Sequence, residues 1–462
     1  MLTANQYFTH RYRRIPAKVS LILFLTSPTL SMNGPARHKN QETYFNLVNG
    51  GVRLYSVLWF WRNKVWWIND MGFYKKTSLA ILILPLFLYP FLPHADERQT
   101  IQALYLPLAD HYAALVAYEK YRNQMTHADF RIQKMKSWPQ LRGAFLDGGA
   151  DMAFIISPLA MDMFRQKPDF HWVSLMHRDG NALAINAQLQ QGSTLPENKA
   201  DRQPDANIAL AFKRARDQLG HASVTAVPSL LSTHAVVLYK YLRDHNLELG
   251  LGKEKDDADV MAIEVPPAQS IAFIKRENER GVPASFEQSL PWADIVETAG
   301  AGHIAWYSKD VLPWPKGHVE CIAIAADQTI HDKPAALQEV IYFIHRAAQD
   351  IEHARQTPGP EMAEIVNMIR QHVPQHPPKA IIQSLDAALN AINYRYLDVD
   401  KPGLKMVMDL AVAAGILKHP IDIDTFADPR FGMAMSELST AEINALNLDA
   451  IIQSRWSSKK SP

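Results

Sequence analysis

Polar side chains gather at predicted turns that lead from a strand into a helix. A helix N-terminus presents free N–H groups and a partial positive charge, so turns of this kind suit small anions. The residues at these turns are Asp110, His111, Ser137, Trp138, Ser157, Asn181, Ser232, Thr233, His234, Lys316 and His318. Ordinary helix capping is the alternative role for Asp110, Ser137, Ser157 and Thr233. His234 is the sharpest ligand candidate, because it follows two hydroxyl residues at a helix start.

Motifs for catalysis or for a helical metal site are missing from the sequence. The three histidines of one predicted helical region are spaced by fourteen and eight residues, whereas two ligands one turn apart need a spacing of three or four: His331, His345 and His353. The glycine pair at 148–149 precedes a strand, but a dinucleotide-binding loop follows one. No Gly-x-Ser-x-Gly frame is present. We therefore expect a binding protein without a cofactor and not an enzyme.

The elements that must position these residues begin with a compact stretch at 101–186. Its pattern predicts a strand at 101–107, a helix at 112–120, a strand and helix within 146–161, and a strand at 180–186. This order implies parallel strands, and in open α/β sheets ligands bind at the carboxyl ends of such strands.

The rest of the chain continues the alternation and then becomes helical. A polar, turn-rich loop is predicted at 188–204. Strands are predicted at 223–227, 259–265 and 320–325, helices at 235–245 and 270–279, and a strand, turn and helix at 284–297. Long helices are then expected at 336–354, 360–372, 379–391 and 403–415.

Residues 71–95 have the pattern of a secretory signal peptide. Two lysines precede an apolar run that two prolines interrupt, and a small residue, Ala95, precedes Asp96. This run is too short and too broken for a membrane span. Residues 1–70 are then a leader of doubtful status, and a mis-assigned start at Met1 is the preferred explanation. Its four tryptophans leave a membrane-surface anchor as the alternative.

Removal of the first 95 residues changes the charge of the protein. The remaining chain holds 37 basic and 45 acidic residues, a formal net charge of −8. An acidic protein is a poor nucleic-acid binder, so nucleic acid is not expected as a partner. The single cysteine, Cys321, cannot form an internal disulfide. With the signal peptide, these features predict a protein of the periplasm.

Short motifs spread along the chain resemble a known family of solute-binding proteins. The motifs are residues 104–117, Ser137-Trp138, 149–153 with 157–160, 180–182, Thr233-His234, 265–269, Pro291-Trp292 and 426–428. Their order and spacing, from about residue 99 to 431, are similar to those of ABC-importer binding proteins for nitrate, bicarbonate, taurine, other sulfonates and pyrimidine precursors. The resemblance implies a type 2 periplasmic-binding-protein fold, with two lobes that are each a mixed sheet flanked by helices, and a helical C-terminal region.

The resemblance also implies which residues surround the ligand. In the nitrate and bicarbonate branch, a tryptophan, a glutamine, a histidine and a lysine hold the anion. Here Trp138 matches the tryptophan, His234 the histidine and Lys316 the lysine, while Phe154 stands where the glutamine is expected. An aromatic ring removes one hydrogen bond to an oxyanion, so Phe154 favours a ligand with an organic part, such as a sulfonate or a planar heterocycle. The implied ligand set is Asp110, His111, Trp138, Phe154, Ser157, Asn181, Thr233, His234 and Lys316.

The predicted lobes comprise residues 96–187 with 321–462, and residues 188–320. The crossovers are expected near 183–188 and 321–327, with Trp138, Ser157 and Asn181 in the first lobe and His234 and Lys316 in the second. Closure over the ligand and docking on a permease with its ATPase are the implied mechanism. The alternatives are a binder of a pyrimidine or other planar heterocycle, a periplasmic sensor and a cytosolic pyrimidine-forming enzyme of the same fold. Such an enzyme would carry a cysteine-rich stretch, which this sequence does not.

Overall fold

The computed structural model describes residues 98–252, 257–357 and 359–432, all within the compact unit Pro90–Pro462. The leader at 1–70 and the signal peptide at 71–95 lie outside the described residues. Over the described ranges, every helix is either too short or too polar to cross a membrane.

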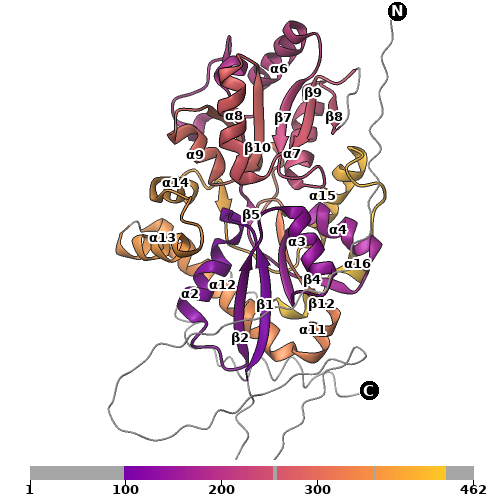
Figure 1. Ribbon diagram of the computed structural model, residues 1–462, viewed down its shortest axis with the longest axis vertical. Coiled ribbons are helices and arrows are strands. Elements are labelled where there is room, and N and C mark those ends of the chain that lie inside the picture. The colour runs from indigo at the N-terminus through magenta and orange to yellow at the C-terminus, as the bar shows by residue number, and fades with distance from the viewer. Residues whose placement is uncertain (1–97, 253–256, 358, 433–462) are drawn as a thin grey trace, which may run out of the picture. The chain divides into compact units, whose positions relative to one another are not determined.

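The first sheet has the strand order β2-β1-β3-β12-β4 (Figure 1). Strand β1 runs parallel to β2 and β3, while β12 runs antiparallel to β3 and β4. The strands are β1 (Gln99–Tyr105), β2 (Ala128–Lys134), β3 (Met152–Ile156), β4 (Phe170–Leu175) and β12 (Cys321–Ala326). The helices between its first four strands are α2 (Tyr112–Tyr121), α3 (Trp138–Leu146) and α4 (Ser157–Gln166). The sheet is therefore mixed, as predicted.

Strands β3 and β12 are central in this sheet and consist almost entirely of apolar residues. All five residues of β3 and the first five of β12 are buried. A strand covered on both faces needs a continuous apolar run, not an alternating one. The run Cys-Ile-Ala-Ile-Ala therefore explains why the chain returns to the centre of the first sheet at residue 321.

The second sheet has the order β11-β6-β10-β7-β9-β8. Its strands are β6 (Asn181–Ile185), β7 (Ser223–Val227), β8 (Leu249–Leu251), β9 (Val260–Glu264), β10 (Ala284–Ser289) and β11 (His303–Tyr307). Its helices are α5 (Ala187–Gln190), α6 (Ala206–Leu219), α7 (Thr233–Asp244), α8 (Ser270–Glu279), α9 (Trp292–Thr298) and α10 (Ser308–Val311). Strand β6 is antiparallel to both of its neighbours, so this sheet is also mixed.

The chain crosses between the sheets at residues 176–180 and 308–320. A short pair, β5 (Arg178–Asp179) with β13 (Ile392–Asn393), lies between the two sheets in Figure 1. This corrects the prediction for Asn181, which pairs with Ser289 in the second sheet and does not belong with the first. The predicted crossovers at 183–188 and 321–327 fall on strands β6 and β12, whose apolar runs are needed inside the sheets.

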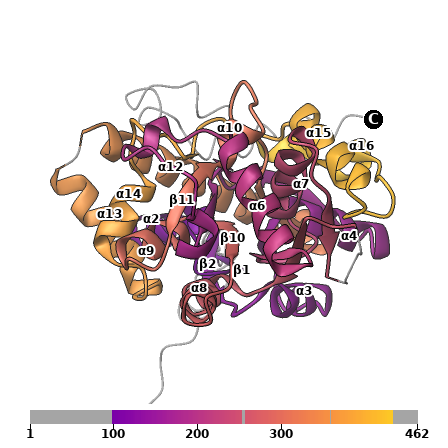
Figure 2. The same cartoon turned by 90° about the horizontal axis from the view of Figure 1, so that it is seen from above.

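The C-terminal helices are α11 (Asp327–Asp332), α12 (Pro334–Gln356), α13 (Pro360–His372), α14 (Pro378–Ser384), α15 (Lys401–Ala413) and α16 (Ile423–Phe426). Helix α12 packs against α2 and β2. Helices α13 and α14 lie on the opposite side from α15 and α16 (Figure 2). The predicted helix at 379–391 ends at Ser384, because the Asp386 carboxylate accepts the N–H groups of Ala388 and Leu389 in a turn.

Two strands of the first sheet were not predicted. Strand β2 lies at the edge and is only partly buried, so its apolar signal is weak. Strand β4 also lies at an edge, and its run Phe-His-Trp-Val-Ser-Leu includes two polar residues. The residues that follow β4, among them His177, were therefore not predicted as ligands.

Candidate functional site

Eight of the nine predicted ligand residues lie buried in the described structure, with side chains exposed by at most 1%. They are Asp110, His111, Trp138, Phe154, Ser157, Asn181, Thr233 and His234. They come from the carboxyl end of β1, from β3, from the starts of α3, α4 and α7, and from β6. Sequence-distant segments therefore supply one buried region between the two sheets.

Direct contacts join the two sheets across this region. The Ser289 hydroxyl, at the end of β10, donates to Asp110 Oδ2 at 2.9 Å. The hydroxyl oxygens of Ser157 and Thr233 lie 3.5 Å apart. The indole N–H of Trp292 donates to the Pro107 carbonyl at 3.2 Å. Because these pairs link the segment after β1 and the start of α4 with β10, α7 and α9, the two sheets are joined by direct contacts in this region.

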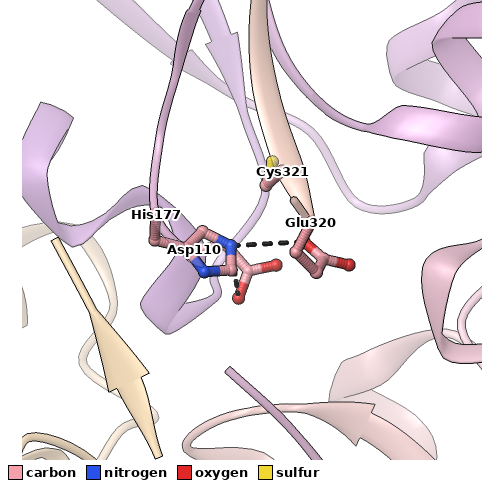
Figure 3. Close-up of side chains that lie close together, drawn as sticks. All are labelled: Asp110, His177, Glu320 and Cys321. Atoms are coloured by element: carbon pink, nitrogen blue, oxygen red, sulfur yellow. Dashed lines mark ion pairs between the residues drawn. The ribbon is translucent and has the colours of Figure 1, made fainter. Parts of the chain in front are cut away.

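His177 lies at the centre of a polar cluster that the sequence analysis missed (Figure 3). Its Nε2 atom is 3.6 Å from Asp110 Oδ1 and 3.2 Å from Glu320 Oε2. Cys321 follows Glu320 at the start of β12, and one ligand-type atom from each of the four residues lies within 4.8 Å of the others. We call Asp110, His177, Glu320 and Cys321 the central cluster; all four are fully buried.

Asp110, Glu320 and Cys321 each contact one further side chain outside the central cluster. His234 connects two of these contacts, with Nε2 2.9 Å from the Ser289 hydroxyl and Nδ1 3.4 Å from Glu320 Oε1. Ser289 in turn holds Asp110. His111 Nε2 lies 3.3 Å from the Cys321 sulfur, and His111 Nδ1 lies 2.8 Å from the Leu106 carbonyl.

Aromatic rings close one side of the cluster. The ring of His111 meets Trp138 edge-on with centroids 6.3 Å apart, and a tilted Phe154 at 5.7 Å. Trp138 Nε1 is buried and has no hydrogen-bond partner among the described residues. Phe154, in β3, thus forms an apolar wall against His111, which agrees with the loss of an amide donor at this position.

The charges of the central cluster depend on burial and on the partners within it. Burial opposes a charge on His177, but Asp110 and Glu320 outweigh this effect and raise its pKa to about 10. Burial also opposes a charge on Asp110, yet His177 dominates and lowers the pKa of this carboxyl below its usual value. Burial and the charge of Asp110 raise the pKa of Glu320 to about 7. Near neutral pH, the cluster is therefore an imidazolium between one full and one partial carboxylate.

The surrounding titratable groups stay neutral. Burial lowers the pKa of His111 to about 4 and that of His234 to about 3. Burial, with the charges of Glu320 and Asp110, raises the pKa of the Glu287 carboxyl and the Cys321 thiol well above their usual ranges. No second cation therefore balances the carboxylates in this part of the described structure.

Many polar atoms here are buried without a hydrogen-bond partner among the described residues. They include His177 Nδ1, both Glu287 oxygens and both amide atoms of Asn181. Asp110 Oδ1, His177 Nε2, His234 Nδ1 and the two Glu320 oxygens also make no regular hydrogen bond, and the ion pairs described above are the contacts that join them. Buried polar groups in proteins nearly always have a partner, and each orphan costs about 1–3 kcal/mol. So many orphans around one point indicate a place where a ligand makes the missing contacts.

Lys316 is the predicted ligand that the structure does not bring to this place. Its side chain is exposed on the second crossover, with Nζ 5.0 Å from the ring centre of Tyr396. It lines two surface cavities of about 340 and 370 Å³ beside Trp314. The crossover buries His318 and Glu320 instead, because His318 N–H and its carbonyl both bond to Asp179 of the first crossover.

The capping alternative holds for some residues and not for others. Ser137 accepts the N–H of Gln140, and Ser232 accepts that of Ala235, so both cap a helix. Asp110, Ser157 and Thr233 make no such bond at their helix starts. Their side chains are instead directed to the contacts between the sheets.

Three further polar residues of this region were not predicted as ligands from the sequence, and each omission has a reason. His177 follows β4, which was not predicted. Glu320 was predicted as the first residue of a strand, although a charged residue just before a buried apolar run can indicate a functional site. Glu287 lies inside the buried strand β10, where an acidic side chain is unusual.

The two mixed sheets with crossovers between them define a periplasmic-binding-protein fold. A ligand-binding component of an ABC-type import system from Staphylococcus aureus, solved with zinc bound, is 18% identical, with TM-score 0.56, over 74% of this chain and 99% of that one. The periplasmic nitrate-binding protein of Synechocystis PCC 6803 is 18% identical, with TM-score 0.58, over 80% and 91%. An alkanesulfonate-binding protein from Xanthomonas axonopodis is 13% identical, with TM-score 0.52, over 72% and 99%.

The model of the NMT1-like family matches residues 94–367, more than half of the chain. The protein therefore belongs to the NMT1-like family. No curated protein sequence matches this chain significantly.

Proposed function

We propose that this protein is the periplasmic solute-binding component of an ABC importer. The observation that carries this proposal is a fully buried set of unpartnered polar atoms to which both sheets contribute. A solute can favour closure only if it interacts differently with the open and closed forms, and a site built from two lobes provides this difference. The importer-type and periplasmic solute-binding proteins of the same fold support the proposal.

The proposed lobes are the first sheet with the C-terminal helices, and the second sheet. The proposed hinges are the crossovers at 176–180 and 308–320. The first contains two consecutive residues with positive φ, Asp179 at 59° and Gly180 at 96°. Glycine adopts positive φ without strain, whereas Asp179 is held there by its surroundings, and hinges are often made of a few residues of this kind.

The proposed partners are a membrane permease and its ATPase, and the proposed role is binding without catalysis. Export would use the signal peptide at 71–95, with cleavage after Ala95. N-terminal sequencing of the protein purified from its native cell tests this step. Asp96 as the first residue is expected, and Met1 or Met71 would contradict export through this segment.

The carboxylates of the site favour a solute with positive charge or with hydrogen-bond donors over a bare oxyanion. Asp110 and Glu320 both face the central cluster, and His177 is already engaged by both. Lys316, the cation implied for nitrate binding, is on the surface. A nitrate-like anion would therefore meet carboxylate repulsion with little compensation. A thermal-shift screen should show larger shifts with divalent cations and amino-substituted heterocycles than with nitrate, bicarbonate, taurine or alkanesulfonates.

His234 provides a test of closure. Its imidazole contacts Ser289 of the second lobe and Glu320 at the end of the second crossover, next to β12 of the first lobe. His234→Ala should weaken the affinity for the solute identified in the screen about tenfold, because one hydrogen bond to a charged network is lost. His245→Ala, on the other end of α7, is the matched control and should bind normally. Unchanged affinity of His234→Ala by calorimetry would sink the assignment of this cluster as the solute site.

A further inference from the structure

We propose that the central cluster binds one divalent metal ion of the borderline-soft class, represented by Zn²⁺, and that this ion is the solute. The inference rests on the proposed function and names its substrate class. The four ligands would be Asp110 Oδ1, His177 Nε2, Glu320 Oε2 and Cys321 Sγ, which come from the end of β1, the first crossover and the start of β12.

The spacing of the donor atoms fits co-ligands of one ion. His177 Nε2 is 3.6 Å from Asp110 Oδ1 and 3.2 Å from Glu320 Oε2. Tetrahedral ligands at about 2.0–2.1 Å from zinc lie about 3.3–3.4 Å from one another. Charge-assisted hydrogen bonds are shorter, at about 2.7–2.9 Å. Both separations are close to those of co-ligands of one ion, and they are longer than those of a contracted ion pair.

The same donor atoms make no regular hydrogen bond. Asp110 Oδ1, His177 Nε2 and Glu320 Oε2 are fully buried, and among the described residues they are joined only by the two ion pairs drawn in Figure 3. A buried salt-bridge triad with a merely structural role should satisfy these atoms. One ion at the centre would satisfy all three together.

Neighbouring groups orient the ligands, as expected around a metal. Ser289 holds Oδ2 of Asp110, which leaves Oδ1 for the ion. His234 lies 3.4 Å from the other oxygen of Glu320, and His111 contacts the Cys321 sulfur. Partners of this kind fix ligand geometry in metal sites. Because Ser289 and His234 belong to the second lobe, an ion held by the first lobe and the crossover would also stabilise contacts to the second.

The mixture of donors selects the class of ion. Calcium and magnesium prefer sites made of oxygen atoms alone. A site with one nitrogen, two oxygens and one sulfur suits zinc and its neighbours among the divalent transition metals. Binding releases to solvent the protons of His177 and Cys321 and the proton that Glu320 partly holds, so the ion meets a neutral imidazole, a thiolate and two carboxylates.

The test is a titration of the metal-free mature protein, residues 96–462, with Co²⁺ and then Zn²⁺. One Co²⁺ per chain is expected, with visible bands of tetrahedral Co²⁺ and a near-ultraviolet sulfur-to-cobalt band. Cys321→Ser should lose the sulfur band, and Glu320→Gln should bind at least about 100-fold more weakly. Circular dichroism of each variant checks folding, and the wild-type spectrum alone reports thiolate ligation if a variant fails to fold.

His331→Gln is the matched control, since it removes an exposed histidine that pairs with Asp332 at 2.7 Å. It should bind Co²⁺ as the wild type does. Equal binding by wild type and Glu320→Gln, or octahedral spectra without the sulfur band, would show an adventitious surface ion and overturn the inference. Stabilisation by a heterocycle but not by Zn²⁺ would also overturn it and leave the importer function standing. If no solute in the screen stabilises the wild type, both proposals fail.

Discussion

The loop around Lys316 has open cavities at the surface, whereas the central cluster holds buried polar atoms without a regular hydrogen bond among the described residues. The loop lines two open cavities of about 340 and 370 Å³, and its lysine contacts the ring of Tyr396 in solvent. The central cluster is fully buried, but three of its four donor atoms, those of Asp110, His177 and Glu320, make no regular hydrogen bond in the described structure. In the proposed closed form the site is hidden, so buried polar atoms without a hydrogen bond are a better guide to the proposed ligand site than a surface cavity is.

Replacing His177 should have the largest effect. His177→Leu leaves the charged carboxyl of Asp110 buried without its cation and should lower the free energy of unfolding by about 3–5 kcal/mol. His331→Leu removes a histidine from an exposed pair with Asp332 and should leave the free energy of unfolding nearly unchanged. Urea unfolding at pH 7 measures both. Equal losses of unfolding free energy for His177→Leu and His331→Leu would contradict the stabilising role of the buried histidine.

The stability that His177 provides should depend on pH. The fold raises its pKa from 6.5 to about 10, so the protonated form is favoured in the folded state. The contribution is therefore complete below pH 6.5 and is lost as the pH rises through 10. The difference in unfolding free energy between wild type and His177→Leu should shrink steadily over this range. A constant difference from pH 6.5 to 10 would contradict the imidazolium.

Gly317 joins the exposed loop to the buried cluster. Its φ of 87° is in the left-handed region, and an added Cβ would overlap Asp179 Oδ2 and lie 2.9 Å from Asn393 Nδ2. Gly415 has a similar φ of 70°, with nothing within 4 Å of an added Cβ. Gly317→Ala should therefore destabilise the protein by about 1–3 kcal/mol more than Gly415→Ala in thermal unfolding. Similar losses of stability in the two variants would show that the crossover shifts to accommodate the added Cβ at residue 317 without a large cost.

Lys316→Ala should have the smallest effect. The side chain is exposed, and a single cation–π contact at the surface contributes about 0.5–1 kcal/mol. Affinity for the solute should stay within about twofold of wild type, in contrast to His234→Ala. A loss of affinity comparable to that of His234→Ala would move the site toward the loop.

The sequence predicted much of the fold because strands β3 and β12 are continuous apolar runs and the long helices have regular apolar spacing. Strands β1, β3, β10 and β12 and helices α12, α13 and α15 were all expected near their observed positions. The edge strands β2 and β4 were not predicted, because β2 is only partly buried and the apolar run of β4 is interrupted by a histidine and a serine. Asn181 was assigned to the wrong sheet, because an apolar strand does not reveal which sheet it joins.

The site was predicted in part for a related reason. Asp110 and His234 were predicted because they lie at turns that lead into helices, and both side chains lie in the buried region. His177 and Glu320 meet them only through pairing of strands far apart in sequence, such as β12 with β4. Spacing along the chain carries no trace of that pairing. Lys316 was expected at the ligand, but its crossover turns the lysine outward and His318 inward.

A crystal structure of the mature protein grown with Zn²⁺ tests the central claim most directly. We expect the lobes closed, with density for one ion within about 2.0–2.3 Å of the four donor atoms of the central cluster. The account would be contradicted if the cluster held no ligand and His177 instead made direct hydrogen bonds of about 2.7–2.9 Å to both carboxylates.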